Sequence, residues 1–129
     1  MAKNAKDFEE RPWGTFQVIG ELKTNTNGDV VVKIMTIRPG KRVSYQKHQF
    51  RSEHWHIVQG EGFVTLDDEK IPVTVDSKIH IPILAKHRIT NTHDSVDLIF
   101  IETIEGQFDE YDNERLEDDF ERDSSWRNT

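Results

Sequence analysis

The feature that most limits the fold of this chain is a succession of short runs rich in Val, Ile and Thr between Thr15 and Thr103. Gly, Pro, Asn and Asp separate these runs, and no sustained helical period passes through them. Such runs predict β-strands, and the pairs Asn27-Gly28 and Asp67-Asp68 supply turn chemistry between them. The expected strands are Thr15–Ile19, Val30–Ile37, Arg42–His48, Glu53–Gln59, Gly62–Leu66, Ile71–Val75, Lys78–Ile81, His87–Asn91 and Asp97–Thr103. So many short strands at regular spacing favour a small all-β sandwich or barrel, because these folds leave few sheet edges exposed.

The length of the chain, 129 residues, suits one domain that buries roughly two thirds of the surface of its unfolded form. We expect a single domain over residues 1–129, with a barrel core from about residue 11 to about residue 105. The pattern changes in residues 106–129, where acidic side chains are concentrated and apolar ones are scattered. For this segment we expect a short, solvated tail, with a helix as one form that it can take.

Composition limits the partners and the cofactor. Cysteine is absent, so a metal would have to be held by imidazole, carboxylate or amide groups, and a reducing compartment is the simplest expectation. No apolar run approaches the roughly 20 residues that span a bilayer, and the first residues lack the apolar core of a signal peptide. The net charge of −7 argues against nucleic acid, which is bound by clustered Lys and Arg. We therefore expect a soluble, cytoplasmic protein with neither a membrane nor a nucleic-acid partner.

Four polar residues form the strongest candidate site. Gln46 and His48 lie two apart on an expected strand, so both point to one face while Lys47 points away. Glu53 follows after a short connection, and an antiparallel return would bring its carboxylate beside them, with His87 closing the site from another strand. Two imidazoles, one carboxylate and one amide oxygen suit a single borderline divalent ion: zinc first, with manganese, iron, cobalt or nickel as alternatives. Because the ligands carry only one negative charge, the ion would stay positive and could hold a substrate oxygen in an open position.

Two stretches of the sequence resemble the motifs of the cupin superfamily. The stretch Gly40–Glu53 resembles the first motif, in which a glycine precedes two alternating ligands and a glutamate, and a second glycine follows. The stretch Asp76–Asn91 resembles the second motif through Pro82, His87 and Asn91. The fold that this resemblance implies is a single cupin barrel, a double-stranded β-helix or jelly roll.

A narrower resemblance covers nearly the whole chain in order. It is to the C-terminal cupin domain of type II mannose-6-phosphate isomerases, which is often fused to a mannose-1-phosphate guanylyltransferase, and in that family the first metal ligand is likewise a glutamine. The matching segments are Arg11-Pro12-Trp13-Gly14, Gln46-x-His48, Arg51-Ser52-Glu53-His54-Trp55, Ile81-Pro82, His87-Arg88 and Arg115-Leu116-Glu117-Asp118-Asp119-Phe120. The glycine-rich nucleotide loop of the fused enzyme has no counterpart in this sequence, so guanylyl transfer is not expected of it.

The resemblance implies a metal-dependent isomerase that interconverts mannose 6-phosphate and fructose 6-phosphate. Such a reaction moves a proton between two carbons, so it needs a base, a group that stabilises an oxyanion and an anchor for the phosphate. We expect Arg51, beside the ligand set, to contact substrate, and Lys33 and Arg42 are further candidates to bind it. Glu102, inside an otherwise apolar strand, is the first candidate for the base, because burial would raise its pKa. His54 is the second, although strict alternation from its neighbour Glu53 would point it away from the metal.

Other readings of the same residues stay open. The barrel could belong to another cupin enzyme, such as a sugar-nucleotide epimerase or a dioxygenase, since fold and ligands do not determine chemistry. It could also be a noncatalytic sugar-binding module. In either case we expect a small phosphosugar or sugar ligand, and a homodimer is a further expectation because cupins often pair.

Overall fold

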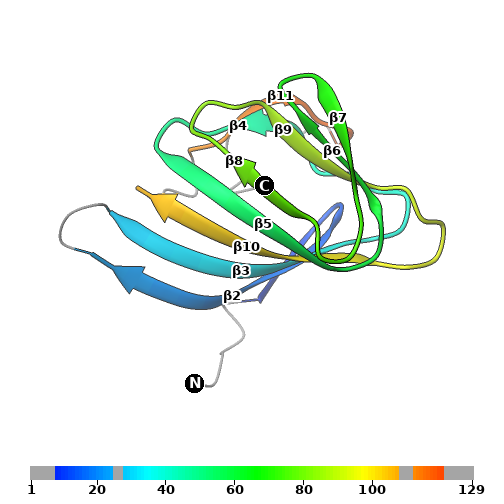
Figure 1. The fold of residues 1–129 in the computed structure, drawn as a ribbon, viewed down its shortest axis with the longest axis horizontal. Helices are drawn as coiled ribbons and strands as arrows, with labels where there is room; N and C mark the ends of the chain where they lie inside the picture. The colour runs from blue at the N-terminus through cyan, green and yellow to red at the C-terminus, as the bar shows by residue number, and fades with distance from the viewer. Residues whose placement is uncertain (1–7, 25–27, 108–111, 121–129) are drawn as a thin grey trace.

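The computed structural model describes residues 8–24, 28–107 and 112–120. All regular structure in these residues is β-strand, arranged in two antiparallel sheets (Figure 1). The first sheet contains, in spatial order, β1 (Phe8–Arg11), β2 (Gly14–Lys23), β3 (Asp29–Ile37), β10 (Leu98–Gly106), β5 (Arg51–Gln59) and β8 (Lys78–Ile81). The second contains β11 (Glu114–Glu117), β4 (Tyr45–Lys47), β9 (His87–Asn91), β6 (Gly62–Leu66) and β7 (Glu69–Val73). In Figure 1 the second sheet lies over the first, so the strands enclose a common interior.

Alternation along the strands places the core between the sheets. On β3 and β10 every second residue is buried, as the two-residue period of a strand requires. Most of these inward side chains are apolar, and Met35 and Phe100 join Trp13 in one buried core cluster. The same alternation brings Lys33 and Glu102 inward, where they are directly opposite each other in the β3–β10 register. The interior therefore has a polar part as well as an apolar core.

The all-β prediction is confirmed, and each expected strand is present with bounds shifted by a few residues. Two strands were not expected: β1 at the start of the described residues and β11 near their end. The helix considered for the tail is wrong for residues 112–120, which form β11 and the turn after it. The physical reason is that the backbone of β11 pairs antiparallel with the edge strand β4. No helix in the described ranges is long and apolar enough to cross a membrane.

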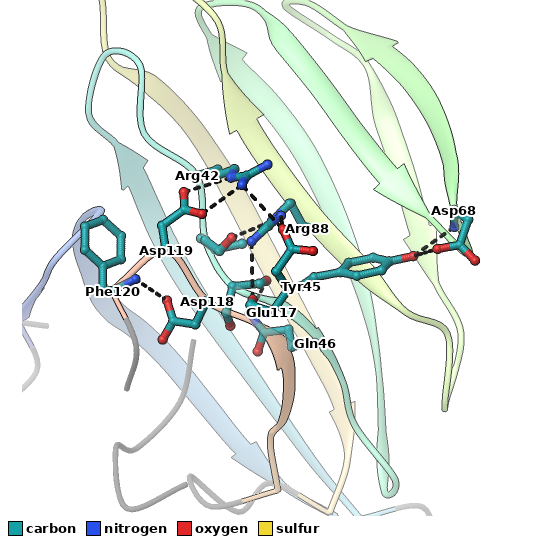
Figure 2. Close-up of polar contacts among 11 residues, drawn as sticks. Arg42, Tyr45, Gln46, Asp68, Arg88, Glu117, Asp118, Asp119 and Phe120 are labelled. Atoms are coloured by element: carbon teal, nitrogen blue, oxygen red, sulfur yellow. Dashed lines mark hydrogen bonds and ion pairs between the residues drawn. The ribbon is translucent and has the colours of Figure 1, made fainter. Parts of the chain in front are cut away.

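Residues 112–120, which we call the C-terminal strap, are tied to the second sheet by arginines (Figure 2). The Arg42 guanidinium donates to both carboxylate oxygens of Asp119 at 2.8 Å. Arg88 donates to Glu117 at 2.8 Å and to the carbonyl oxygen of Val43 at 2.8 Å. These contacts hold the strap beside β4, the strand that contains Gln46 and directly precedes His48.

We expect Gly62→Ala to destabilise the fold by roughly 1–3 kcal/mol, the usual cost of overpacking a close contact. A Cβ at position 62 would overlap the backbone carbonyl of Thr90 on the paired strand β9, and backbone cannot move aside as a flexible side chain can. Urea denaturation of both proteins measures the difference.

Gly20→Ala is the matched control, because a Cβ there meets no heavy atom within 4 Å. This variant should keep wild-type stability. Equal unfolding midpoints for the two variants would contradict the argument from close packing.

Candidate metal centre

Three of the four expected ligands come together between the sheets. His48 follows β4, Glu53 lies on β5 and His87 is the first residue of β9, and their exposed fractions are 2%, 0% and 1% respectively. One ligand atom from each lies within 4.8 Å of the others. His48 Nε2 is 3.2 Å from Glu53 Oε2, and His87 Nε2 is 4.0 Å from Glu53 Oε1. The three side chains therefore face one point inside the barrel.

Backbone carbonyls set the tautomer of both imidazoles. His48 Nδ1 lies 2.6 Å from the carbonyl oxygen of Asp112, and His87 Nδ1 lies 2.8 Å from that of Ala85. A carbonyl only accepts, so each Nδ1 carries the hydrogen and each Nε2 presents its lone pair to the cluster. Burial lowers the pKa of His48 to about 3, and burial also lowers the pKa of His87. Both rings are thus neutral near pH 7, which is the form that binds a metal.

Glu53 is a fully buried carboxylate that stays ionised. Burial by itself would raise its pKa, but the electrostatic effect of the surrounding groups, the positive Arg51 guanidinium among them, outweighs burial and lowers the pKa below the ordinary value. Trp55 Nε1 also donates to Glu53 Oε1 at 3.0 Å. The cluster therefore combines two neutral nitrogen donors with one negatively charged oxygen donor.

This donor set fits a divalent metal ion. His87 Nε2 and Gln46 Oε1 are both buried without a hydrogen-bond partner among the described residues, although buried polar atoms rarely lack one. Gln46 is buried and lies directly opposite His87 in the β4–β9 register, on the side of the sheet that faces the cluster. Imidazole, carboxylate and amide oxygen together suit a borderline ion. His48, Glu53 and His87 can hold such an ion, and their three donor atoms would fill only part of its coordination shell.

Comparison with known proteins places the chain in a family. Residues 2–118 match the model described as mannose-6-phosphate isomerase C-terminal. The chain belongs to this family. The chain has the cupin-like fold that the sequence predicted. A cupin-2 domain from Rhodospirillum rubrum superposes on it with a TM-score of 0.67 at 16% identity, covering 89% of this chain and 71% of that one.

Several relatives of this isomerase-family domain are longer proteins. The alginate biosynthesis protein AlgA of Pseudomonas aeruginosa is 38% identical over 113 residues, which cover 87% of this chain and 22% of AlgA. The xanthan biosynthesis protein XanB of Xanthomonas campestris is 34% identical, with 87% of this chain and 23% of XanB covered. Among solved structures, the capsular polysaccharide assembling protein CapF of Staphylococcus aureus has a TM-score of 0.67 and 26% identity, covering 85% of this chain and 34% of CapF. The chain thus spans under a quarter of the length of AlgA and XanB.

Arg51 lies inside this isomerase-family domain rather than at the mouth of a cavity. Its side chain is buried, and its Nε donates to Glu53 Oε2 at 3.1 Å. Its Nη2 lies 3.1 Å from His48 Nε2. The guanidinium therefore contacts two of the three clustered ligands directly.

Lys33 and Glu102 complete the buried polar group. The two residues face each other across β3 and β10, and Glu102 also lies opposite Trp55 on β5. Burial raises the pKa of Glu102 well above its ordinary value, and the negative charge of Glu53 raises it further. Lys33 Nζ lies 4.4 Å from the centre of the Phe16 ring, within range of a cation–π interaction.

Two sequence candidates lie away from this group. Arg42 is half-exposed and engages Asp119 of the strap, outside the barrel interior (Figure 2). His54 is exposed on the opposite face of β5, where its ring stacks on that of His80 at 4.5 Å. The alternation of β5 explains the second placement, since Glu53 and Trp55 on either side of it point inward.

Asp112 is the residue near the site that sequence reasoning missed. Besides its carbonyl contact with His48, its carboxylate accepts the backbone N–H groups of Gln49 and Phe50 at 2.9 Å and 3.0 Å. It thus holds both a ligand and the turn that joins His48 to β5. No local pattern pointed to it, because the residues it contacts are more than 60 positions away in the sequence.

We expect the purified chain to bind about one divalent ion, and His48→Ala and His87→Ala each to lose most of it, because each removes one of the clustered donors. Elemental analysis after dialysis measures the metal content. His80→Ala, on the outer face, is the control and should keep it. Unchanged metal content in both ligand variants would rule out this site.

We expect Asp112→Ala to weaken metal binding by about tenfold or more, the usual effect of losing a group that orients a ligand. The lost carboxylate releases the backbone of Gln49 and Phe50 and with it the position of His48. A competitive titration with a chelating indicator gives the dissociation constant. The exposed Asp94→Ala is the control, and equal affinity in the two variants would show that Asp112 does not position the ligand.

Proposed function

We propose that the chain is a metal-dependent sugar-phosphate isomerase that interconverts mannose 6-phosphate and fructose 6-phosphate. The observation that carries this proposal is a buried His48–Glu53–His87 cluster with further titratable and cationic groups around it, in a domain of the mannose-6-phosphate isomerase C-terminal family. A domain that bound sugars only through surface contacts would not need charged groups buried between its sheets, because each is costly to desolvate.

The reaction transfers a proton between C1 and C2 of the sugar, and negative charge develops on the adjacent oxygens. A divalent ion bound by His48, Glu53 and His87 would stabilise that charge as a Lewis acid. The remaining tasks, moving the proton and holding the phosphate, fall to other side chains of the barrel interior.

Glu102 is our candidate for the base. It is buried on β10, next to the ligand cluster, and its pKa is raised by burial and by Glu53. A carboxylate with a raised pKa accepts a carbon-bound proton more readily than an ordinary one, provided that it can ionise when substrate binds. Lys33, directly opposite, supplies a positive charge that favours this ionised form.

Arg51 and Lys33 are our candidates to bind the anionic substrate. Both are cations buried between the sheets, Arg51 against His48 and Glu53 and Lys33 opposite Glu102. In such surroundings a dianionic phosphate or a developing oxyanion gains more from each cation than it would in water. Arg42 is not included, because its guanidinium is paired with Asp119 outside the interior.

A coupled assay on a panel of hexose 6-phosphates, with and without chelator, tests the proposal. We expect turnover of mannose 6-phosphate that is lost with the metal and restored on adding it back. Saturable binding without turnover would favour the noncatalytic sugar-binding module. Turnover that persists without metal would favour an epimerase-like cupin, and a requirement for redox-active iron would favour a dioxygenase.

We expect Glu102→Gln to lower kcat by about 10²–10⁴-fold, the range for loss of a general base, while metal content stays at the wild-type level. The amide keeps the size of the side chain but cannot accept the proton. Steady-state kinetics with elemental analysis measures both quantities. Glu105→Gln, on the same strand but exposed, is the control, and wild-type kcat in Glu102→Gln would exclude Glu102 as the base.

A further inference from the structure

Arg51 bridges two acceptor atoms that would otherwise repel each other. His48 Nε2 and Glu53 Oε2 are only 3.2 Å apart, and because His48 carries its hydrogen on Nδ1, both of these atoms present lone pairs. Arg51 Nη2 donates to the first and Arg51 Nε to the second, each at 3.1 Å. The flat guanidinium fork thus satisfies both lone pairs with one positive charge.

The same lone pairs are the ones that a metal ion would take. An imidazole Nε2 has a single lone pair, so it cannot accept a hydrogen bond from Arg51 and coordinate a metal together. Glu53 differs from His48, because each of its oxygens has more than one lone pair: Oε1 accepts from Trp55 Nε1, Oε2 accepts from Arg51 Nε, and each can still coordinate a metal. Coordination by His48 therefore requires at least the Arg51–His48 contact to break.

We propose that Arg51 is an internal competitor of the metal: it holds the ligands His48 and Glu53 together, and metal binding displaces its guanidinium into the barrel interior. This inference rests on the metal site of the proposed function and extends it. A displaced guanidinium lies beside the ion and can donate to an anionic substrate oxygen. Binding of the metal would then also place the Arg51 guanidinium where it can bind substrate.

The proposal predicts whether removal of Arg51 strengthens or weakens metal binding. Without Arg51, the metal-free protein retains a buried carboxylate that has lost its guanidinium partner, which destabilises that state. In the metal-bound protein, removal of Arg51 also removes a cation close to a divalent ion. Both effects favour the metal-bound state, so the variant should bind metal more tightly. A residue that merely supports the ligands would have the opposite effect.

The test is a competitive titration of Co²⁺ against a chelating indicator in the full chain. We expect Arg51→Met to bind Co²⁺ at least about tenfold more tightly than the wild type, since loss of even one charge-assisted hydrogen bond is worth that much. Arg51→Lys, which can donate to only one acceptor at a time, should be intermediate. Arg11→Met removes another largely buried arginine, paired with Glu9 and far along the chain from the ligands, and should leave the affinity unchanged.

Thermal unfolding gives a second readout. Metal-free Arg51→Met should melt below the metal-free wild type, and saturating Co²⁺ should raise its melting temperature by more than that of the wild type. Equal or weaker Co²⁺ affinity in a folded Arg51→Met overturns the proposal.

If Arg51→Met does not fold, a titration of the wild-type protein tests the proposal instead. Titration with diamagnetic Zn²⁺ should shift the ¹⁵N resonance of Arg51 Nε, and an unmoved resonance at full occupancy overturns the proposal. None of these measurements uses turnover, so a chain that binds metal as described but has no isomerase activity would contradict the proposed function alone. A wild type that binds no metal would overturn both.

Discussion

The rest of this structure depends on the buried, ionised carboxylate of Glu53. A carboxylate without partners would cost several kcal/mol to bury, so the surrounding side chains must supply positive charge and hydrogen-bond donors. Arg51 and Trp55 donate to its two oxygens, and the imidazoles of His48 and His87 lie close by. Each of these groups needs its own position in the interior. The arrangement of β4, β5 and β9 provides those positions.

Strand alternation explains how one small domain contains both a stable core and a polar centre. On β3, Met35 and Ile37 point inward with the apolar cluster, and Lys33 points inward two residues earlier. On β10, Phe100 precedes Glu102 in the same way. The apolar part of each strand contributes hydrophobic burial that offsets the cost of placing charges in the other part. The residues that stabilise the core and the residues that form the polar centre therefore lie on the same two strands, β3 and β10.

The C-terminal strap connects the candidate metal centre to a distant part of the chain. Its first described residue, Asp112, contacts His48 and the turn that leads to β5. Its later residues are held by Arg42 and Arg88 through ion pairs, partly exposed to solvent, that add modest stability individually. Several contacts on one short segment give it a defined place. The orientation of a candidate metal ligand, His48, thus depends on residues far from it in the sequence.

The sequence by itself indicated the strands β2 to β10, because alternation and turn residues are local signals, and the same local period put Gln46 and His48 on one face. Glu53 and His87 were indicated by the type of their side chains and by the resemblance to cupin motifs. The sequence also indicated through strict alternation that His54 would point away from Glu53. Tertiary structure alone decided that Arg51 bridges two ligands, and that Arg42 faces the strap rather than the interior. It also decided that residues 114–117 form a strand. The physical reason is that these outcomes depend on partners brought close only by folding, such as the β4 edge that offers its backbone to β11, and no local pattern records such a partner.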